Sequence, residues 1–185
     1  RLLSGLLSLV LFLGCVPTAG AVGTSASSAI LLDAGSGRVL YEQNADERRP
    51  VASVTKVMAI LLALEALEAG RATLEDPVPV SQTAAGMGGS QVLLDAGETL
   101  PFETLLKSMI VGSANDATVA IGEYLYGSHQ LFVDRMNGRA QELGMADTHF
   151  VNSTGLPAEG HYTTARDVAR MTVEMLKHPL YFDYS

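Results

Sequence analysis

The apolar residues of this chain fall into runs that predict five helices and one pair of short strands. The longest run covers residues 54–69 and is almost wholly apolar until Gly70, a residue type common just past a helix end. Four further helices are predicted where apolar spacing is bounded by capping residues, glycine or proline, over residues 101–111, 115–126, 129–143 and 164–178. Their expected starting residues are Pro101, Asn115 or Asp116, His129, and Thr164 with a capping box completed by Asp167.

Near the beginning of the chain, residues 29–33 and 38–42 are apolar stretches around a turn-rich tract, which predicts a β-hairpin. Residues 77–97 contain Pro, Gly and Ser without a period and are predicted to be irregular. Strands followed by a run of helices predict an α+β or three-layer fold. Because two strands cannot form a stable sheet alone, we expect the rest of the sheet in later sequence and the chain to be truncated at its C-terminus.

The first residues predict export. An apolar run at residues 6–13 is followed by small residues, which is typical of a secretory signal peptide, here over residues 1–21. Ala19 and Ala21 fit the small-x-small rule for cleavage, so the mature chain is expected in the periplasm or on the outer face of the cytoplasmic membrane or cell wall. Two alternatives stay open: an uncleaved membrane anchor, or a lipoprotein modified at Cys15, the single cysteine.

The charge of the chain and the spacing of its histidines argue against nucleic acid and metal ions as partners. The chain has 12 Lys and Arg against 20 Asp and Glu, a net charge of −8 and no basic block, so nucleic acid is not expected as a partner. The histidines show no ligand spacing such as His-Glu-x-x-His, so no metal and no other cofactor is expected. We interpret all four as ordinary surface or loop residues: His129, His149, His161 and His178.

The Ser53-Val-Thr-Lys56 stretch at the start of the long apolar helix is a candidate for chemistry. A serine and a lysine three residues apart lie on one helical face, which suits a serine nucleophile whose proton is taken by a lysine amine. Burial and the positive end of the helix dipole would both favour the neutral lysine that a base requires. The alternative is that Ser53 is a simple N-cap and Lys56 a solvated residue of the first turn.

Ser113-Ala-Asn115 is a second candidate, between two predicted helices. A serine hydroxyl can relay a proton to or from a leaving amine, and an amide side chain can hold a peptide group of the substrate. The alternative is a pair of capping residues that stops one helix and starts the next.

Taken together, residues 30–169 resemble the low-molecular-weight penicillin-binding proteins that are serine D-alanyl-D-alanine carboxypeptidases. The matching stretches follow one another in the family's order and spacing. They are Asp33-Ala-Gly-Ser-Gly-Arg-Val-Leu-Tyr41, Arg49-Pro-Val-Ala-Ser-Val-Thr-Lys-Val-Met58, Gly89-Ser-Gln91, Asp95-Ala-Gly97, Ser113-Ala-Asn-Asp-Ala117, Asn152-Ser-Thr-Gly-Leu156 and Thr163-Thr-Ala-Arg-Asp167.

The resemblance implies roles for four residues. Ser53 would be the acylated nucleophile, with its backbone N–H in the oxyanion hole, and Lys56 its general base. Ser113 would be the catalytic serine of the second motif, and Asn115 would bind substrate. Gly155 and Leu156 would belong to a loop near the site. The resemblance assigns no role to this loop.

It also implies a fold and a function. Residues 22–185 would be the N-terminal part of a β-lactamase/transpeptidase-like α+β domain, with strands and nucleophile helix in 28–62, a mostly helical subdomain in 63–150, and the remaining strands missing. The full protein would remove the terminal D-Ala from peptidoglycan peptides ending in D-Ala-D-Ala and be acylated by β-lactam antibiotics. A C-terminal segment outside this chain could bring it to a membrane surface.

One motif of the family is absent. None of the three lysines, Lys56, Lys107 and Lys177, precedes Thr-Gly. In the family, a Lys-Thr-Gly strand binds the substrate carboxylate and supplies the second N–H of the oxyanion hole, and losing one such donor costs about 10²–10³ in rate. The 185-residue chain is therefore expected to be inactive alone.

Two rival functions stay open. A class A-like β-lactamase shares both motifs but needs a glutamate that activates the deacylating water. None of the glutamates after Asn115 has a Glu-x-x-Leu-Asn setting; they are Glu123, Glu142, Glu159 and Glu174. A non-catalytic cell-wall-binding homologue is the other rival, which the intact Ser53 and Lys56 disfavour.

Overall fold

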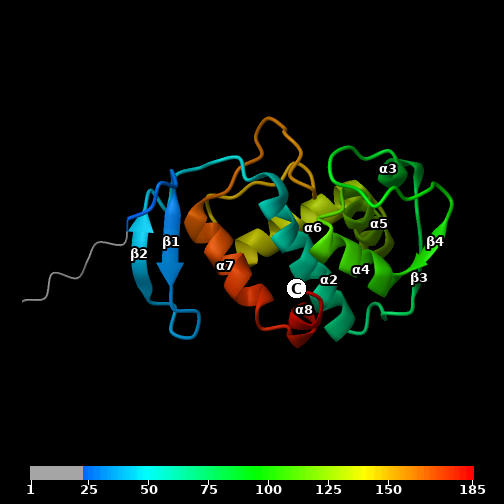
Figure 1. Cartoon of the computed structure of the whole chain (residues 1–185), viewed down its shortest axis with the longest axis horizontal. Helices are drawn as coiled ribbons and strands as arrows, with labels where there is room; N and C mark the ends of the chain where they lie inside the picture. Colours follow the sequence, from blue (N-terminus) through cyan, green and yellow to red (C-terminus); the bar gives the residue numbers. More distant parts are fainter. Residues whose placement is uncertain (1–22) are drawn as a thin grey trace, which may run out of the picture.

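The computed structural model describes residues 23–185, so the expected signal peptide and Cys15 lie outside the described residues. The described helices are η1 (Ala52–Thr55), α2 (Lys56–Glu68), α3 (Gln82–Ala85), α4 (Phe102–Val111), α5 (Asn115–Tyr126), α6 (His129–Glu142), α7 (Ala165–Met175) and α8 (Pro179–Tyr184). The strands are β1 (Ala29–Leu32), β2 (Val39–Gln43), β3 (Pro77–Pro79) and β4 (Thr99–Pro101). Figure 1 shows the β1–β2 hairpin at one end, the helices in the middle and β3–β4 at the other end.

Helix α2 is the central element of the core. Every residue from Met58 to Leu64 is buried, because α4, α5, α6 and α7 contact the helix around its circumference. A helix that is covered on all sides is apolar on all sides, which explains the unbroken apolar run in the sequence. The core therefore fixes the start of α2, where the candidate nucleophile lies.

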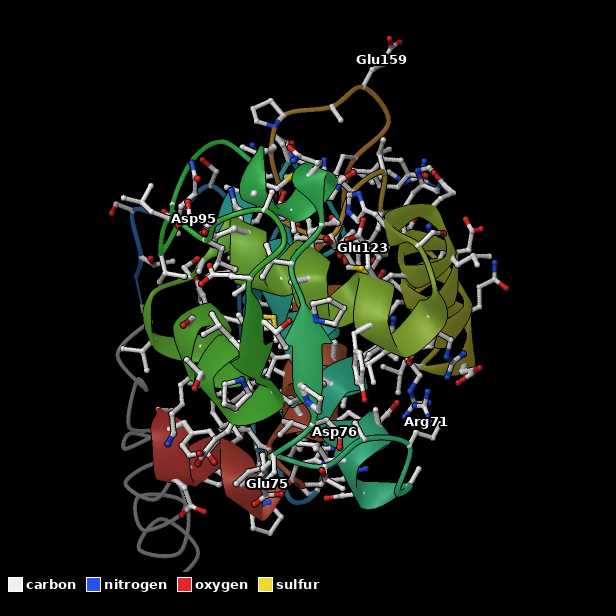
Figure 2. The ribbon with its side chains drawn as sticks, turned by 90° about the vertical axis from the view of Figure 1, so that its right-hand side faces the viewer. Arg71, Glu75, Asp76, Asp95, Glu123 and Glu159 are labelled. Carbon is white, nitrogen blue, oxygen red and sulfur yellow. The ribbon has the colours of Figure 1, made fainter. Side chains whose placement is uncertain are left out.

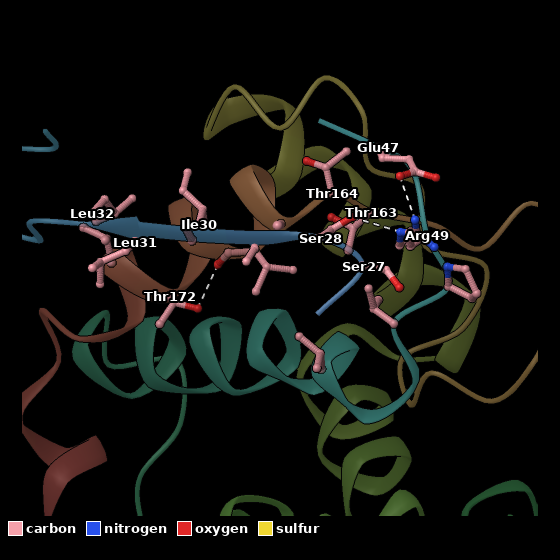
Figure 3. A pocket seen from close by; sticks show the side chains of 18 of the residues that line it. Ser27, Ser28, Ile30, Leu31, Leu32, Glu47, Arg49, Thr163, Thr164 and Thr172 are labelled. Atoms are coloured by element: carbon pink, nitrogen blue, oxygen red, sulfur yellow. Dashed lines mark hydrogen bonds and ion pairs between the residues drawn. The ribbon is translucent and has the colours of Figure 1, made fainter. Parts of the chain in front are cut away.

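The β1–β2 hairpin is confirmed as an antiparallel pair, with Ala29 opposite Gln43 and an irregularity between Leu31 and Leu32. Helix α7 packs against β1. Between β1, residues 50–54 and α7 there is an apolar groove of about 690 Å³ (Figure 3). Ile30, Val168 and Leu176 are among the residues that line it.

The expectation that residues 77–97 are irregular is wrong in part. Residues 77–79 pair with residues 99–101 as strands β3 and β4, and Ser81 caps the short helix α3 through a hydrogen bond from the Ala84 N–H. Each strand has only three residues, so no period of two can be recognised in it. The pairing is stabilised by the burial of Val78. That burial depends on contacts with segments distant in the sequence.

The last predicted helix is divided in two. Helix α7 ends at Met175, and Pro179 is the first residue of a further short helix, α8. Thr164 is confirmed as the N-cap of α7, because its Oγ1 accepts from the Asp167 N–H. The Asp167 carboxylate accepts from the backbone N–H of Asp147 and from Thr148 Oγ1, so it stabilises a neighbouring loop and not a capping box. Among the described helices, none has the length and apolarity to cross a membrane.

Candidate active site

Ser53 and Lys56 meet at the start of the central helix. Ser53 lies in the 3₁₀ turn η1, Lys56 is the first residue of α2, and Lys56 Nζ is 3.1 Å from Ser53 Oγ. Ser53 is exposed, whereas Lys56 is only 3% exposed. The N-cap positions of the two helices belong to Val51 and Thr55, neither of which makes a side-chain cap. The alternative of a capping serine and a solvated lysine is therefore wrong.

The surroundings of Lys56 favour its neutral form. Burial lowers the pKa of Lys56 from 10.5 to about 8. The other two lysines pair with glutamates, Lys107 with Glu103 and Lys177 with Glu174. Over residues 23–185 no carboxylate lies within ion-pair distance of Lys56, where it would raise the pKa of the amine towards 10.5. An amine with this pKa is partly neutral near neutral pH and can accept a proton from Ser53.

The pKa of Lys56 predicts how the reactivity of Ser53 depends on pH. If the neutral amine is the base, the rate of Ser53 acylation should rise about tenfold per pH unit below about pH 8 and level off above it. The measurement is the acylation rate constant of full-length protein against pH. A rate that is flat between about pH 6 and about pH 9 would show that Lys56 is not the base.

The loop of residues 152–156 also contacts the amine of Lys56. The Thr154 carbonyl oxygen accepts from Lys56 Nζ at 3.0 Å. Asn152 Oδ1 accepts from the N–H groups of Thr154 and Gly155, and its Nδ2 donates to the Leu156 carbonyl. Sequence reasoning missed Thr154, although the Asn152–Leu156 stretch was among the matched motifs, because a backbone carbonyl leaves no mark in residue type.

The same loop packs directly behind the nucleophile. Gly155 has φ +82°, and a Cβ added to it would lie 1.7 Å from the Ala52 carbonyl oxygen. Ala52, which precedes Ser53, itself has φ +42°. Only glycine allows the loop to approach the turn this closely, so the role of Gly155 is to seat the loop against the residue before Ser53.

The second motif lies in the connection between α4 and α5. Ser113 adopts φ +52°, and Ala114, not Asn115 or Asp116, is the N-cap of α5, without a side-chain cap. Asn115 Nδ2 donates to the Gly88 carbonyl at 2.6 Å. The capping interpretation of this motif is wrong, because the Asn115 amide is committed to a loop distant in sequence.

Asn115 joins this motif to the rest of the site. Its Oδ1 is buried, and no group in residues 23–185 donates to it. A Cβ added to Gly89 would lie 2.7 Å from Asn115 Nδ2 and 3.5 Å from Leu156 Cδ2. The loop around Gly89, the amide of Asn115 and the 152–156 loop therefore meet at one place.

Asp116 supports the loop that Asn115 contacts. Its side chain is fully buried, and its carboxylate accepts from the backbone N–H groups of Val92 and Leu94, both at 3.1 Å. Carboxylates that accept backbone N–H groups form strong, charge-assisted hydrogen bonds. Asp116 thus fixes the wall of the site, a role that sequence reasoning did not assign.

The structure brings together some of the expected residues and not others. Ser53, Lys56 and the 152–156 loop are in direct contact, and Asn115 is joined to that loop through Gly89. Within the described residues, Ser113 makes no hydrogen bond to Ser53 or Lys56. The catalytic role of Ser113 and the oxyanion-hole role of the Ser53 N–H stay predictions.

The interpretation of all four histidines as surface or loop residues did not foresee that two of them are buried, although both of these lie in loops. His161 is 7% exposed and His178 is 8% exposed. His129 is half-buried and only His149 is exposed. In the part of the chain that the structure describes, no three His, Cys, Asp or Glu side chains gather as a metal site would require.

An exposed serine lies beside a buried lysine at the start of a central helix, and among residues 23–185 no carboxylate pairs with that lysine. This is the arrangement that acyl transfer to a serine with a lysine base requires. The chain belongs to the D-alanyl-D-alanine carboxypeptidase family, whose model matches residues 16–185. This membership confirms the resemblance found in the sequence.

Individual relatives agree with the family. The chain is 43% identical over 187 residues to D-alanyl-D-alanine carboxypeptidase DacF of Bacillus subtilis, covering 96% of this chain and 48% of the relative. The crystal structure of D-alanyl-D-alanine carboxypeptidase DacD from Francisella tularensis matches with a TM-score of 0.84 and 36% identity, over 87% of this chain and 39% of the neighbour. Penicillin binding protein 6B from Escherichia coli matches with a TM-score of 0.81 and 32% identity, over 85% and 52% of the two chains.

These neighbours confirm the penicillin-binding-protein type of α+β fold. The chain spans about half the length of the curated relative that it matches.

Proposed function

We propose that the full-length protein is a serine D-alanyl-D-alanine carboxypeptidase. The observation that carries the proposal is the contact of Ser53 Oγ with the buried Nζ of Lys56, which has no carboxylate within ion-pair distance among residues 23–185. Lys56 takes the hydroxyl proton, and Ser53 Oγ attacks the carbonyl carbon of the penultimate D-Ala. The peptide C–N bond breaks, the terminal D-Ala leaves with a proton, and water then hydrolyses the ester to regenerate Ser53.

The remaining groups of the site receive roles in this scheme. The Ser53 N–H stabilises the oxyanion, Ser113 relays the proton to the leaving amine, and Asn115 binds a peptide group of the substrate. Support for the last role comes from the buried Asn115 Oδ1, an acceptor placed beside the 152–156 loop.

We further propose that residues 22–185 are the N-terminal part of the catalytic domain. The relatives are about twice as long as the matched region, and the apolar groove along β1 offers a surface for further strands (Figure 3). One of those strands would carry the Lys-Thr-Gly motif. Export of the protein, and its attachment to a membrane surface by a later segment, belong to the same proposal.

The β-lactamase alternative fits the glutamates less well. Glu142 pairs with Arg135, and Glu174 pairs with Lys177. Figure 2 shows Glu159 at the tip of a loop, pointing away from the molecule, and Glu123 on α5. None of these four glutamates is thereby supported as the activator of a deacylating water. The alternative of a non-catalytic homologue leaves unexplained the cost of burying the Lys56 amine with no carboxylate beside it among residues 23–185.

The experiment that tests the proposal uses a labelled penicillin and full-length protein. We expect an adduct on Ser53, found by mass spectrometry, with about one equivalent bound and slow release. A peptide ending in D-Ala-D-Ala should release D-Ala over many turnovers, because the leaving D-Ala diffuses away while the tethered leaving group of a β-lactam obstructs water.

Three results would count against the proposal. An adduct on Ser113 would reassign the nucleophile. Rapid destruction of penicillin would favour the β-lactamase. The absence of D-Ala release by folded protein with an intact Lys-Thr-Gly would favour the non-catalytic homologue.

A further inference from the structure

His161 joins the nucleophile turn to the loop that holds Lys56. Its Nε2 is 2.8 Å from Thr55 Oγ1, and Thr55 lies between Ser53 and Lys56 in the sequence. Its Nδ1 accepts from the Val151 N–H at 3.1 Å. Thr55 is fully buried and His161 nearly so. Both nitrogens of the ring are therefore engaged, one on each side of the candidate site.

This pair of contacts determines where the proton of His161 lies. A backbone N–H can only donate, so Nδ1 must carry a lone pair. The proton of the neutral ring is then on Nε2, which donates to Thr55 Oγ1. In the charged form, an Nδ1–H would face the Val151 N–H, and two donors would oppose each other.

The contact matters because the same segment holds the catalytic pair. Val151 immediately precedes the 152–156 loop, whose Thr154 carbonyl accepts from Lys56 Nζ. Losing the Val151–His161 hydrogen bond would loosen the loop and leave the ring, which still donates to Thr55 Oγ1, without a fixed position. Thr55 and this loop lie on either side of the 3.1 Å contact between Lys56 Nζ and Ser53 Oγ.

We propose that neutral His161 is a positioning residue that holds the Ser53–Lys56 turn against the 152–156 loop, and that its protonation slows acylation of Ser53. The inference rests on the proposed function for its kinetic consequence. His161 does not touch the reacting atoms, so it acts through Thr55 and the loop.

The charged groups around the ring agree with a neutral His161. Burial lowers the pKa of His161 below its ordinary value of 6.5, and the nearby His149 lowers it further. His129, whose Nε2 is 2.9 Å from Ser153 Oγ in the same loop, also has a pKa lowered by burial, opposed by Glu123.

The sign of the pH effect follows from these shifts. The unfolded chain binds a proton at His161 at a higher pH than the folded chain does. The contribution of neutral His161 to folding stability is therefore complete above pH 6.5 and is lost as the pH falls through the lowered pKa. The same titration should release the 152–156 loop.

The test is the pH profile of Ser53 acylation by a labelled penicillin, measured on full-length protein and on His161→Gln. In the wild type, the rate should fall about tenfold per pH unit below about pH 8, and about a hundredfold per unit once His161 also titrates. Glutamine stays neutral, and its amide can donate to Thr55 Oγ1. His161→Gln should keep the first break and lose the second, with a rate near pH 8 within about tenfold of the wild type.

Two matched variants identify the titrating group. His149→Gln changes an exposed histidine whose Nδ1 contacts the Gly160 carbonyl, and His129→Gln changes the other partly buried one. Both should keep the second break, which should lie at a higher pH in His149→Gln because His149 no longer lowers the pKa of His161. A break that survives in His161→Gln, or that disappears in His129→Gln instead, overturns the proposal.

A second measurement does not depend on activity. The ¹⁵N shifts of the wild-type His161 ring should show the Nε2–H form near neutral pH, and hydrogen exchange of the Val151 amide should accelerate as the ring titrates. An Nδ1–H form, or a Val151 amide indifferent to that titration, would contradict the proposal. If Ser53 is never acylated at any pH, the proposed function fails. The ¹⁵N shifts of the His161 ring and the hydrogen exchange of the Val151 amide then decide the role of His161 by themselves.

Discussion

Replacing Lys56 by arginine should lower the rate of Ser53 acylation about 10²–10⁴-fold, the range that a positioned general base contributes. Arginine keeps the positive charge but cannot give up its proton inside a protein. The measurement is the acylation rate constant of full-length protein with a labelled penicillin, with circular dichroism to show that the fold persists. Lys56→Ala should lose acylation to a similar extent.

The chain offers a matched control for this prediction. Lys107 is exposed and pairs with Glu103 on the surface of α4. Lys107→Arg keeps that ion pair and should leave acylation unchanged. Near-normal acylation by Lys56→Arg would show that charge alone suffices at this position, and the assignment of a base would have to be given up.

Replacing Gly155 by alanine should destabilise the protein by about 4 kcal/mol or more, at the upper end of single-substitution effects. The new Cβ would lie 1.7 Å from the Ala52 carbonyl oxygen, a contact that only a shift of backbone can relieve. The shift moves either the residue before Ser53 or the loop that carries the Thr154 carbonyl. Acylation should therefore be lost even in the fraction of molecules that stays folded.

Gly160 provides the comparison that separates crowding from backbone strain. It also has a positive φ, +79°, but a Cβ added there would meet no atom closer than 3.9 Å. Gly160→Ala should cost only the roughly 1–2 kcal/mol of a left-handed non-glycine residue. Urea unfolding and penicillin acylation measure both variants. Equal losses in the two would mean that the contact between Gly155 and Ala52 is not what matters.

The contacts of Arg139 and Asp116 stabilise the helices and the loop around the candidate site. Arg139 on α6 forms ion pairs with Glu65 of α2 and Glu174 of α7, so the central helix is joined to its neighbours by charge as well as by apolar packing. Asp116 fixes the 92–94 loop beside Asn115. The site therefore lies on elements whose positions are determined by buried contacts on several sides.

The sequence was sufficient where a local pattern carries the information. The start and end of α5 and α6, the hairpin near residue 35 and the Ser53–Lys56 pair all depend on residues within a few positions of one another. Helical spacing alone places a side chain at i and one at i+3 on the same face. The order of the short motifs was enough to recognise the family that the comparisons confirm.

The sequence was insufficient where contacts between distant segments decide the structure. The three-residue strands β3 and β4 exist because they pair across about twenty residues, and no period could reveal them. The division of the last helix at Pro179 and the use of Asp116 by a backbone loop, not as a cap, were also beyond a local reading.

What the sequence by itself determined is the chemistry that is available: a serine and a lysine on one helical turn, and an asparagine at the start of a later helix. What only the tertiary structure decided is the state of those groups. Burial in the folded chain, and not the motif, lowers the pKa of Lys56 to about 8. The contact of the Thr154 carbonyl with Lys56, the close approach of Gly155 to Ala52 and the contact of His161 with Thr55 each join segments about a hundred residues apart. Such contacts depend on the folded backbone, because desolvation and hydrogen-bond geometry exist only once the whole chain has packed.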